Sequence, residues 1–214
     1  MKKSIKPNPY LLLLAALVSL PSLAQAHHAE FMTGKPFLQG ISMPIHGLDH
    51  MLVAIAVGLI AAQLGGKALW AIPGIFTVSV LLGGILNIMG VPVPLAEYGI
   101  LASIAVCGVL LAWGSRVSIL LTLCVIAIFA SFHGSALMVS ENSFQNMPVF
   151  FAGCLLSALL LQGIGIGLGL LLQKLLQARV YRYAGFAMLV VAVIISFFPG
   201  VNSFVINLVE KSAL

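Results

Sequence analysis

The stretch "SILLTLCVIAIFASF", residues 118–132, decides the class of fold. It is apolar almost throughout and does not alternate between apolar and polar residues. A membrane β-barrel strand alternates over about 10 residues, whereas an apolar run of about 20 residues is typical of a transmembrane helix. Runs of this kind recur along nearly the whole chain. We therefore expect an all-α, polytopic membrane helix bundle.

The composition agrees with this expectation, because 61% of the 214 residues are hydrophobic and only 7% are charged. A soluble domain would have about a quarter of its residues charged. We expect six transmembrane helices, at about residues 44–63, 69–90, 95–114, 117–138, 148–173 and 180–198. The connections between them are short, so residues 27–214 should form a single domain of antiparallel neighbours. Cys107, Cys124 and Cys154 fall inside the apolar runs, which predicts small buried side chains and no disulfide framework.

Two features inside these spans indicate helix packing. The fifth span carries four glycines at alternating positions, Gly163, Gly165, Gly167 and Gly169, which favour close contact between helices or, alternatively, a hinge. Gly83 and Gly84 suggest the same for the second span, where Asn87 is suited to a hydrogen bond between helices or to a place on a path. Ser103 and Gln162 are further polar residues in the spans.

The first 26 residues are typical of a secretory signal peptide. Lys2, Lys3 and Lys6 precede the apolar stretch "LLLLAALVSL", and small residues follow at Ala24 and Ala26. We expect cleavage after Ala26; an uncleaved seventh helix is the alternative.

The distribution of charge predicts the orientation in the membrane. With residue 27 outside, six spans also place the C-terminus outside, and this topology satisfies the positive-inside rule. The inside loops then contain Lys67, Arg116, Lys174, Arg179 and Arg182, and the outside segments contain Lys35 and Lys211. We expect a multi-pass protein of the bacterial inner membrane with both termini in the periplasm. The sequence contains no basic cluster of the kind that would indicate nucleic-acid binding.

Ionisable residues gather in "MPIHGLDHML", residues 43–52. If Pro44 opens a helix, His46, Asp49 and His50 share one face of its first two turns, because residues three and four apart lie together. Imidazole binds divalent transition metals, and a carboxylate adds negative charge or orients an imidazole. The alternative is an ordinary interfacial helix start, with Asp49 favoured by the helix dipole.

His133 and Glu97 are expected on the same side of the membrane, at the outer ends of the fourth and third spans. Each is suited to a metal-ligand role or to a structural one. We therefore predict a metal site made by His46, Asp49, His50, His133 and Glu97. His27 and His28 would open the mature chain, where they could capture metal or form a solvated tail.

These residues carry a resemblance to a known family. The blocks "PIHGLDHMLVAIAVGLIAAQLGGKALWAIP" (44–73), "LLGGILNIMGVPVPLAEYGILAS" (81–103) and "FASFHGSA" (129–136) resemble the HupE/UreJ family of bacterial membrane proteins, which is associated with nickel and sometimes cobalt uptake. Asp49 and His50 match the family signature HPxxGxDH. Glu97 matches the acidic residue that opens the family's third span.

The chain departs from the family pattern at several places. The first histidine of the signature falls on Met43, and in the fourth-span pattern HGxAHGxE the second histidine falls on Leu137 and the acidic residue on Ser140. The fifth span has Gln162 where the family commonly has a histidine. The resemblance implies metal transport but leaves the substrate open.

The sequence leaves three functions open. The first is a secondary permease for nickel or cobalt, driven by a gradient or a partner, since no nucleotide-binding motif GxxxxGK[ST] is present. The second is an intramembrane zinc-dependent hydrolase, and the third is a membrane metal-binding subunit or sensor that does not transport. For the permease we expect no enzymatic activity and no permanently bound cofactor. Its partners would be the divalent metal ion and the lipid bilayer; homo-oligomers and metalloenzyme-maturation partners stay open.

Overall fold

The apolar runs of the sequence fold into seven α-helices and a short 3-10 helix in the part of the chain that the structure, a computed structural model, describes: residues 35–91, 93–137, 146–176 and 179–197. In chain order these elements are α2 (Pro36–His46), α3 (Leu48–Leu64), α4 (Ala68–Ile88), α5 (Ala96–Trp113), η2 (Gly114–Arg116), α6 (Ile119–Leu137), α7 (Met147–Leu176) and α8 (Arg179–Phe197). The expected signal peptide, His27, His28 and Ser140 lie outside the described residues.

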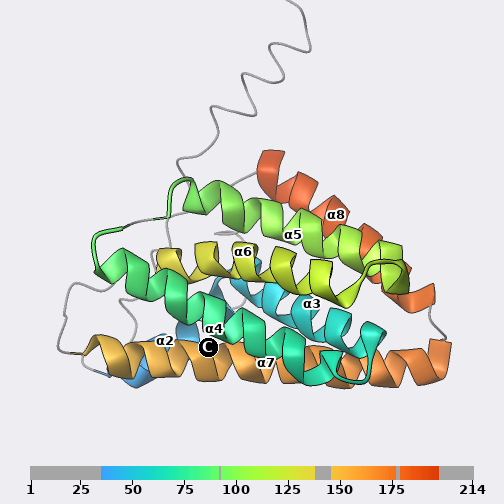
Figure 1. The fold of residues 1–214 in the computed structure, drawn as a ribbon, viewed down its shortest axis with the longest axis horizontal. Helices are drawn as coiled ribbons and strands as arrows, with labels where there is room; N and C mark the ends of the chain where they lie inside the picture. Colours follow the sequence, from blue (N-terminus) through green and yellow to red (C-terminus); the bar gives the residue numbers. More distant parts are fainter. Residues whose placement is uncertain (1–34, 92, 138–145, 177–178, 198–214) are drawn as a thin grey trace, which may run out of the picture.

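The helices run side by side in one bundle (Figure 1), with α3 packed against α4, α5 and α7. The most extensive helix pairs are α4 with α6, α3 with α7, α2 with α7, and α5 with α8. Among the described residues five helices, α4 to α8, are each long and apolar enough to cross a membrane. The pair of α2 and α3 passes the same test only together, as a span bent by 76°. The all-α membrane bundle expected from the sequence is therefore confirmed.

Glycines set the closest helix contacts, and they do so in pairs. A Cβ atom on Gly165 of α7 would lie 2.1 Å from the carbonyl oxygen of Ile55, and one on Gly58 of α3 would lie 2.1 Å from that of Gln162. Gly83 of α4 and Gly134 of α6 have the same reciprocal relationship, each against the other helix's backbone. Small residues let helix backbones approach closely where lipid offers no hydrophobic driving force.

The predicted packing role of the alternating glycines is confirmed for half of them. Gly165 and Gly169 face α3, whereas Gly163 and Gly167 have open space beside them. Two residues on one helix face must be three or four positions apart, so alternating glycines cannot all meet the same neighbour. Asn87 makes the expected bond between helices, because its Nδ2 donates to the carbonyl oxygen of Ser135 at 2.8 Å.

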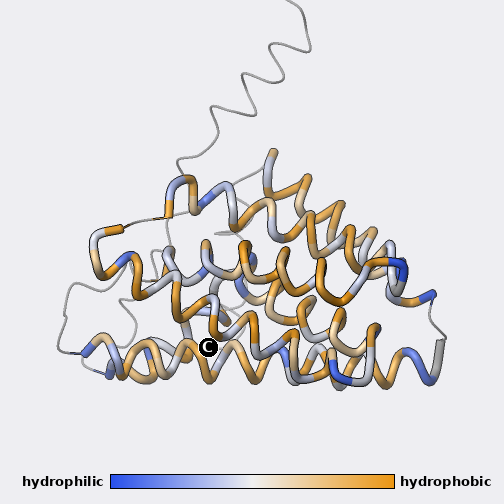
Figure 2. Tube along the Cα trace, viewed as in Figure 1, coloured by the Kyte–Doolittle hydropathy of each residue, from blue (hydrophilic) through white to orange (hydrophobic). Residues whose placement is uncertain are grey.

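The residues along the helices are mostly apolar, and polar residues gather toward the two ends of the bundle (Figure 2). Large apolar side chains such as Leu82, Leu120 and Leu160 are more than half exposed, as expected for side chains that face lipid. Cys107 and Cys154 are buried, but Cys124 is exposed, so the prediction that all three cysteines are buried is wrong for Cys124. Its position in α6 turns it away from the neighbouring helices.

The first span differs from the sequence prediction. Pro44 lies near the end of α2, not in the first turn of a helix, and the chain breaks at Gly47 before α3 begins. Gly47 has an extended conformation (φ −86°, ψ 104°), which ends the regular helix. The prediction that one helix carries His46, Asp49 and His50 on one face is therefore wrong: His46 ends α2, while Asp49 and His50 open α3.

Candidate metal centre

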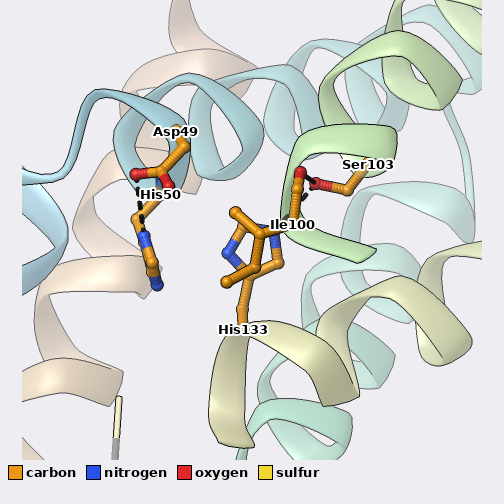
Figure 3. Close-up of polar contacts among 5 residues, drawn as sticks. All are labelled: Asp49, His50, Ile100, Ser103 and His133. Carbon is orange, nitrogen blue, oxygen red and sulfur yellow. Dashed lines mark hydrogen bonds and ion pairs between the residues drawn. The ribbon is translucent and has the colours of Figure 1, made fainter. Parts of the chain in front are cut away.

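Asp49 and His50 form a bonded pair in the first turn of α3. The Asp49 Oδ1 atom lies 3.0 Å from His50 Nδ1 and 2.9 Å from the backbone nitrogen of His50. A carboxylate only accepts hydrogen bonds, so the imidazole donates through Nδ1–H and carries its lone pair on Nε2. Figure 3 shows this pair at the start of α3. His50 Nε2 is buried and has no hydrogen-bond partner among the described residues.

His133 approaches this pair from α6. It is 2% exposed, and its ring meets that of His50 at 87° with the centroids 4.7 Å apart. The two imidazoles face each other from different helices (Figure 3). The Phe76 ring lies on another side of His133, with its centroid 6.2 Å away. The close contact between α4 and α6 at Gly83 and Gly134 holds His133 at this depth.

Ser103 of α5 fixes the tautomer of His133. The Ser103 hydroxyl donates its only proton to the carbonyl oxygen of Ile100, and Ser103 Oγ lies 2.9 Å from His133 Nε2. With the hydroxyl proton on the Ile100 oxygen, His133 donates through Nε2–H to Ser103 Oγ, and this tautomer has its lone pair on Nδ1. Both histidines thus have one nitrogen bonded to a protein oxygen, and the other nitrogen of His50, Nε2, has no hydrogen-bond partner among the described residues. Carboxylates and other oxygens orient metal-binding histidines in the same way.

A cavity of about 10 Å³ lies beside the two imidazoles. We call it the histidine cavity; its wall includes His50, His133, Ala54, Phe76, Leu137 and Ala158. Apart from the two histidines these side chains are apolar. A space of this size holds about one atom the size of a water molecule. It suits a single ion without its hydration shell.

The other sequence-predicted ligands differ in their placement. Glu97 lies in the first turn of α5, as expected, but it is exposed and does not line the histidine cavity. The His46 backbone ends α2, and the placement of its side chain lies outside what the structure describes. Among the described residues, no three His, Cys, Asp or Glu side chains form a group that could hold a metal ion together. The site is therefore an imidazole pair with an orienting carboxylate.

The positions where the chain departs from the family pattern have distinct surroundings. Met43 is partly buried and packs against the core, and Leu137 supplies an apolar part of the wall of the histidine cavity. Gln162 is 1% exposed, and neither polar atom of its side chain has a hydrogen-bond partner among the described residues. The sequence singled out Ser103 and Gln162 as polar, and Pro44 and Gly47 are the signals that could have indicated the helix break. The contact between Phe76 and His133 has no signal in the sequence.

The fold and this site define a multi-pass helical membrane protein with a pair of imidazoles, one buried and one half-buried, beside a helix break. The sequence model of the HupE / UreJ protein family matches residues 14–195. The chain is also 35% identical over 170 residues to Protein HupE from Rhizobium leguminosarum bv. viciae, a match that covers 79% of this chain and 88% of that protein. No solved structure matches. The chain belongs to the HupE/UreJ family, a transporter-type family, which indicates a role related to nickel or cobalt transport.

Proposed function

We propose that this protein is a secondary permease for a divalent transition-metal ion, nickel or cobalt, and that His50 and His133 take the ion. One observation carries the proposal: two imidazoles from different helices keep a free lone pair beside one ion-sized cavity. Neutral imidazole nitrogen is a good ligand for both metals. Family membership supports the same substrate class.

The helix break supports transport more than permanent metal storage. Secondary transporters bind their substrates at discontinuous helices, whose ends leave backbone groups free. Here α2 and α3 meet at 76° directly before Asp49 and His50. A permeating ion must also leave its site, so a pair of nitrogen ligands suits transport better than a closed set of four. Asp49 would orient His50 and supply negative charge.

We assign Glu97 and His46 to the entrance of the ion path. Glu97 is exposed in the first turn of α5, and His46 ends α2 directly before the break. A carboxylate at the mouth of a path raises the local concentration of cations. The ion would then pass from this rim to the imidazole pair.

We also propose that the entrance faces the periplasm. The positive-inside rule places Lys67, Arg116 and Lys174 on the cytoplasmic side, and this puts the start of α3 outside. Cleavage of the signal peptide after Ala26, insertion in the inner membrane and periplasmic termini complete this topology. A gradient or a partner protein would drive transport.

The two alternative functions have less support. A zinc-dependent hydrolase needs room for a lipid or peptide substrate beside the metal, and the histidine cavity of about 10 Å³ has room for an ion only. A non-transporting subunit or sensor would use the same imidazole pair. Net flux of metal across a membrane separates it from a permease.

Uptake of labelled nickel and cobalt into proteoliposomes of the purified protein tests the proposal. We expect uptake by the unaltered protein and its loss in His50→Gln and His133→Gln, because each variant removes one of the two nitrogen ligands. Cys124→Ser is the matched control, since Cys124 shares α6 with His133 but is exposed. Metal binding without flux in the unaltered protein would favour the subunit or sensor. Full uptake by both histidine variants would exclude this site.

A further inference from the structure

A second cavity lies at the end of the bundle opposite the histidine pair. Its volume is about 170 Å³, and it lies among the last turns of α3, α5 and α7, the 3-10 helix η2 and the first turn of α8. We call it the arginine cavity; its wall includes Gln63, Trp113, Arg116, Gln173, Tyr181 and Arg182. Unlike the histidine cavity, it is lined mainly by polar groups.

Hydrogen bonds between helices fix the neutral part of this wall. Gln63 Nε2 donates to the carbonyl oxygen of Leu111 at 3.0 Å, which ties α3 to α5. The Tyr181 hydroxyl lies 2.9 Å from the carbonyl oxygen of Gly169 and 3.2 Å from Gln173 Oε1, which ties α8 to α7. Gly114, with a left-handed φ of 70°, ends α5 and leads into η2, which carries Arg116 to the cavity.

The positive charges of this cavity have no acidic partner in the described part of the chain. The acidic residues in the described part of the chain are Asp49 and Glu97. They lie in the first turns of α3 and α5, at the other end of the bundle. The one ion pair among the described residues joins Asp49 to His50. Arg116 and Arg182 therefore line one cavity to which the described residues contribute no carboxylate. An anion placed there would offset the repulsion between them.

The donor geometry favours phosphate as the anion. A guanidinium presents parallel N–H groups that match two oxygens of one phosphate, and two such groups can hold a phosphate from both sides. Trp113, in the wall of the cavity, is 60% exposed, and Tyr183, which follows Arg182 in the sequence, is 70% exposed. Exposed aromatic rings are typical of the level of lipid headgroups. The positive-inside rule accounts for basic residues in loops, but it does not require two of them to share a polar cavity.

We propose that the arginine cavity binds a phosphate-bearing anion through Arg116 and Arg182. The phosphate group of an anionic lipid and free inorganic phosphate share this chemistry. Basic pockets between transmembrane helices bind lipid headgroups in this way. This site is independent of the metal site, so its test does not depend on transport.

Binding is measured on the purified full chain in detergent by native mass spectrometry and by the shift of the thermal unfolding midpoint. The probes are phosphatidylglycerol, phosphatidylcholine and inorganic phosphate. We expect retention of phosphatidylglycerol over phosphatidylcholine, weakened at least about tenfold in the double variant Arg116→Gln and Arg182→Gln. Displacement of the lipid by inorganic phosphate, or a midpoint shift with phosphate alone, would assign the site to the free anion.

Arg179→Gln is the matched control, because Arg179 lies one turn before Arg182 in α8, carries the same charge and does not line the cavity. An equal loss of binding in this control would reduce the effect to general charge attraction and overturn the proposal. Equal retention of both lipids with no effect of phosphate would also overturn it. If the double variant does not fold, Arg116→Lys with Arg182→Lys keeps both charges but removes the paired N–H groups, and binding should still weaken.

Discussion

The imidazoles of His50 and His133 meet edge to face, with their centroids 4.7 Å apart, and each has one ring nitrogen bonded to a protein oxygen. Edge-to-face packing of two rings contributes about 0.5–1.5 kcal/mol, which an apolar aromatic pair would provide as well. A phenylalanine pair would need neither Asp49 nor Ser103. The two oxygens select the tautomers that leave a lone pair on each ring, and this is the requirement of a metal site.

Asp49→Asn tests the orienting role of the carboxylate. An amide holds His50 Nδ1 more weakly and supplies no charge, so we expect nickel binding to weaken about 10- to 100-fold. Equilibrium titration of the purified protein with nickel measures this change. Glu97→Gln removes the same charge outside the histidine cavity, and it should weaken binding much less. Equal effects of the two variants would mean that only general negative charge matters.

Gly47→Ala tests the geometry of the helix break. A Cβ atom at this position would lie 3.0 Å from Asp49 Oδ1 and 3.1 Å from His50 Nδ1, so the bonded pair must shift. The backbone conformation of Gly47 is extended and suits alanine. We therefore expect weaker nickel binding with little change in the thermal unfolding midpoint. Gly74→Ala, which enters open space in α4, is the control and should bind nickel as the unaltered protein does. A normal nickel affinity in Gly47→Ala would show that the pair tolerates the shift.

The spans were predictable from the sequence because their signal is local. An apolar run ends where glycine, proline or charge begins, so the expected span 69–90 and the observed α4, Ala68–Ile88, differ by two residues or fewer at each end. The break at Gly47 is different: Pro44, Gly47 and Asp49 interrupt the apolar run there, but the same residues are also compatible with a single helix that begins at Pro44. The break accompanies the packing of α2 on α7 at Gly40 and Gly153, which are distant in sequence.

The site was predictable in its residue types but not in its assembly. Topology placed His133 on the same side of the membrane as His50, yet only the packing of α6 on α4 brings it into contact with α3. Helix periodicity wrongly joined His46 to Asp49 and His50, because it assumes an unbroken helix. Likewise, Ser103 lies beside His133 because α5 packs against α6. Residue spacing within one helix cannot reveal a contact between two helices.

Gly165→Ala tests the contact between α3 and α7. The added Cβ would meet the backbone oxygen of Ile55 at 2.1 Å, and backbone cannot move aside as a flexible side chain can. We expect a loss of about 1–3 kcal/mol in the free energy of unfolding, typical of overpacking. Thermal unfolding in detergent provides the measurement.

Gly163→Ala and Gly167→Ala are matched controls for this variant. They lie on the same helix with open space beside them, and alanine favours a helix over glycine by up to about 1 kcal/mol. Both should be neutral or stabilising. A similar loss of stability in all three variants would point to a need for flexibility along α7 in place of close packing.

Gln162→Met tests why α7 buries an amide that has no hydrogen-bond partner among the described residues. The side chain is 1% exposed, and leaving a buried polar group unpaired costs about 1–3 kcal/mol. Methionine has a similar volume and no such cost, so we expect the thermal unfolding midpoint to rise. Leu161→Met, at the neighbouring buried position, controls for the methionine itself and should change the midpoint little.

The same variant reports on the path of the ion. Gln162 follows Ala158 of the histidine cavity by one helical turn, so the two residues lie on the same face of α7. A polar amide that is kept at this position although it lowers stability is suited to contact an ion that leaves the imidazole pair. Metal uptake by Gln162→Met should fall while nickel binding at equilibrium stays close to that of the unaltered protein. A lower unfolding midpoint together with unchanged uptake would instead make Gln162 a structural residue with partners inside the bundle.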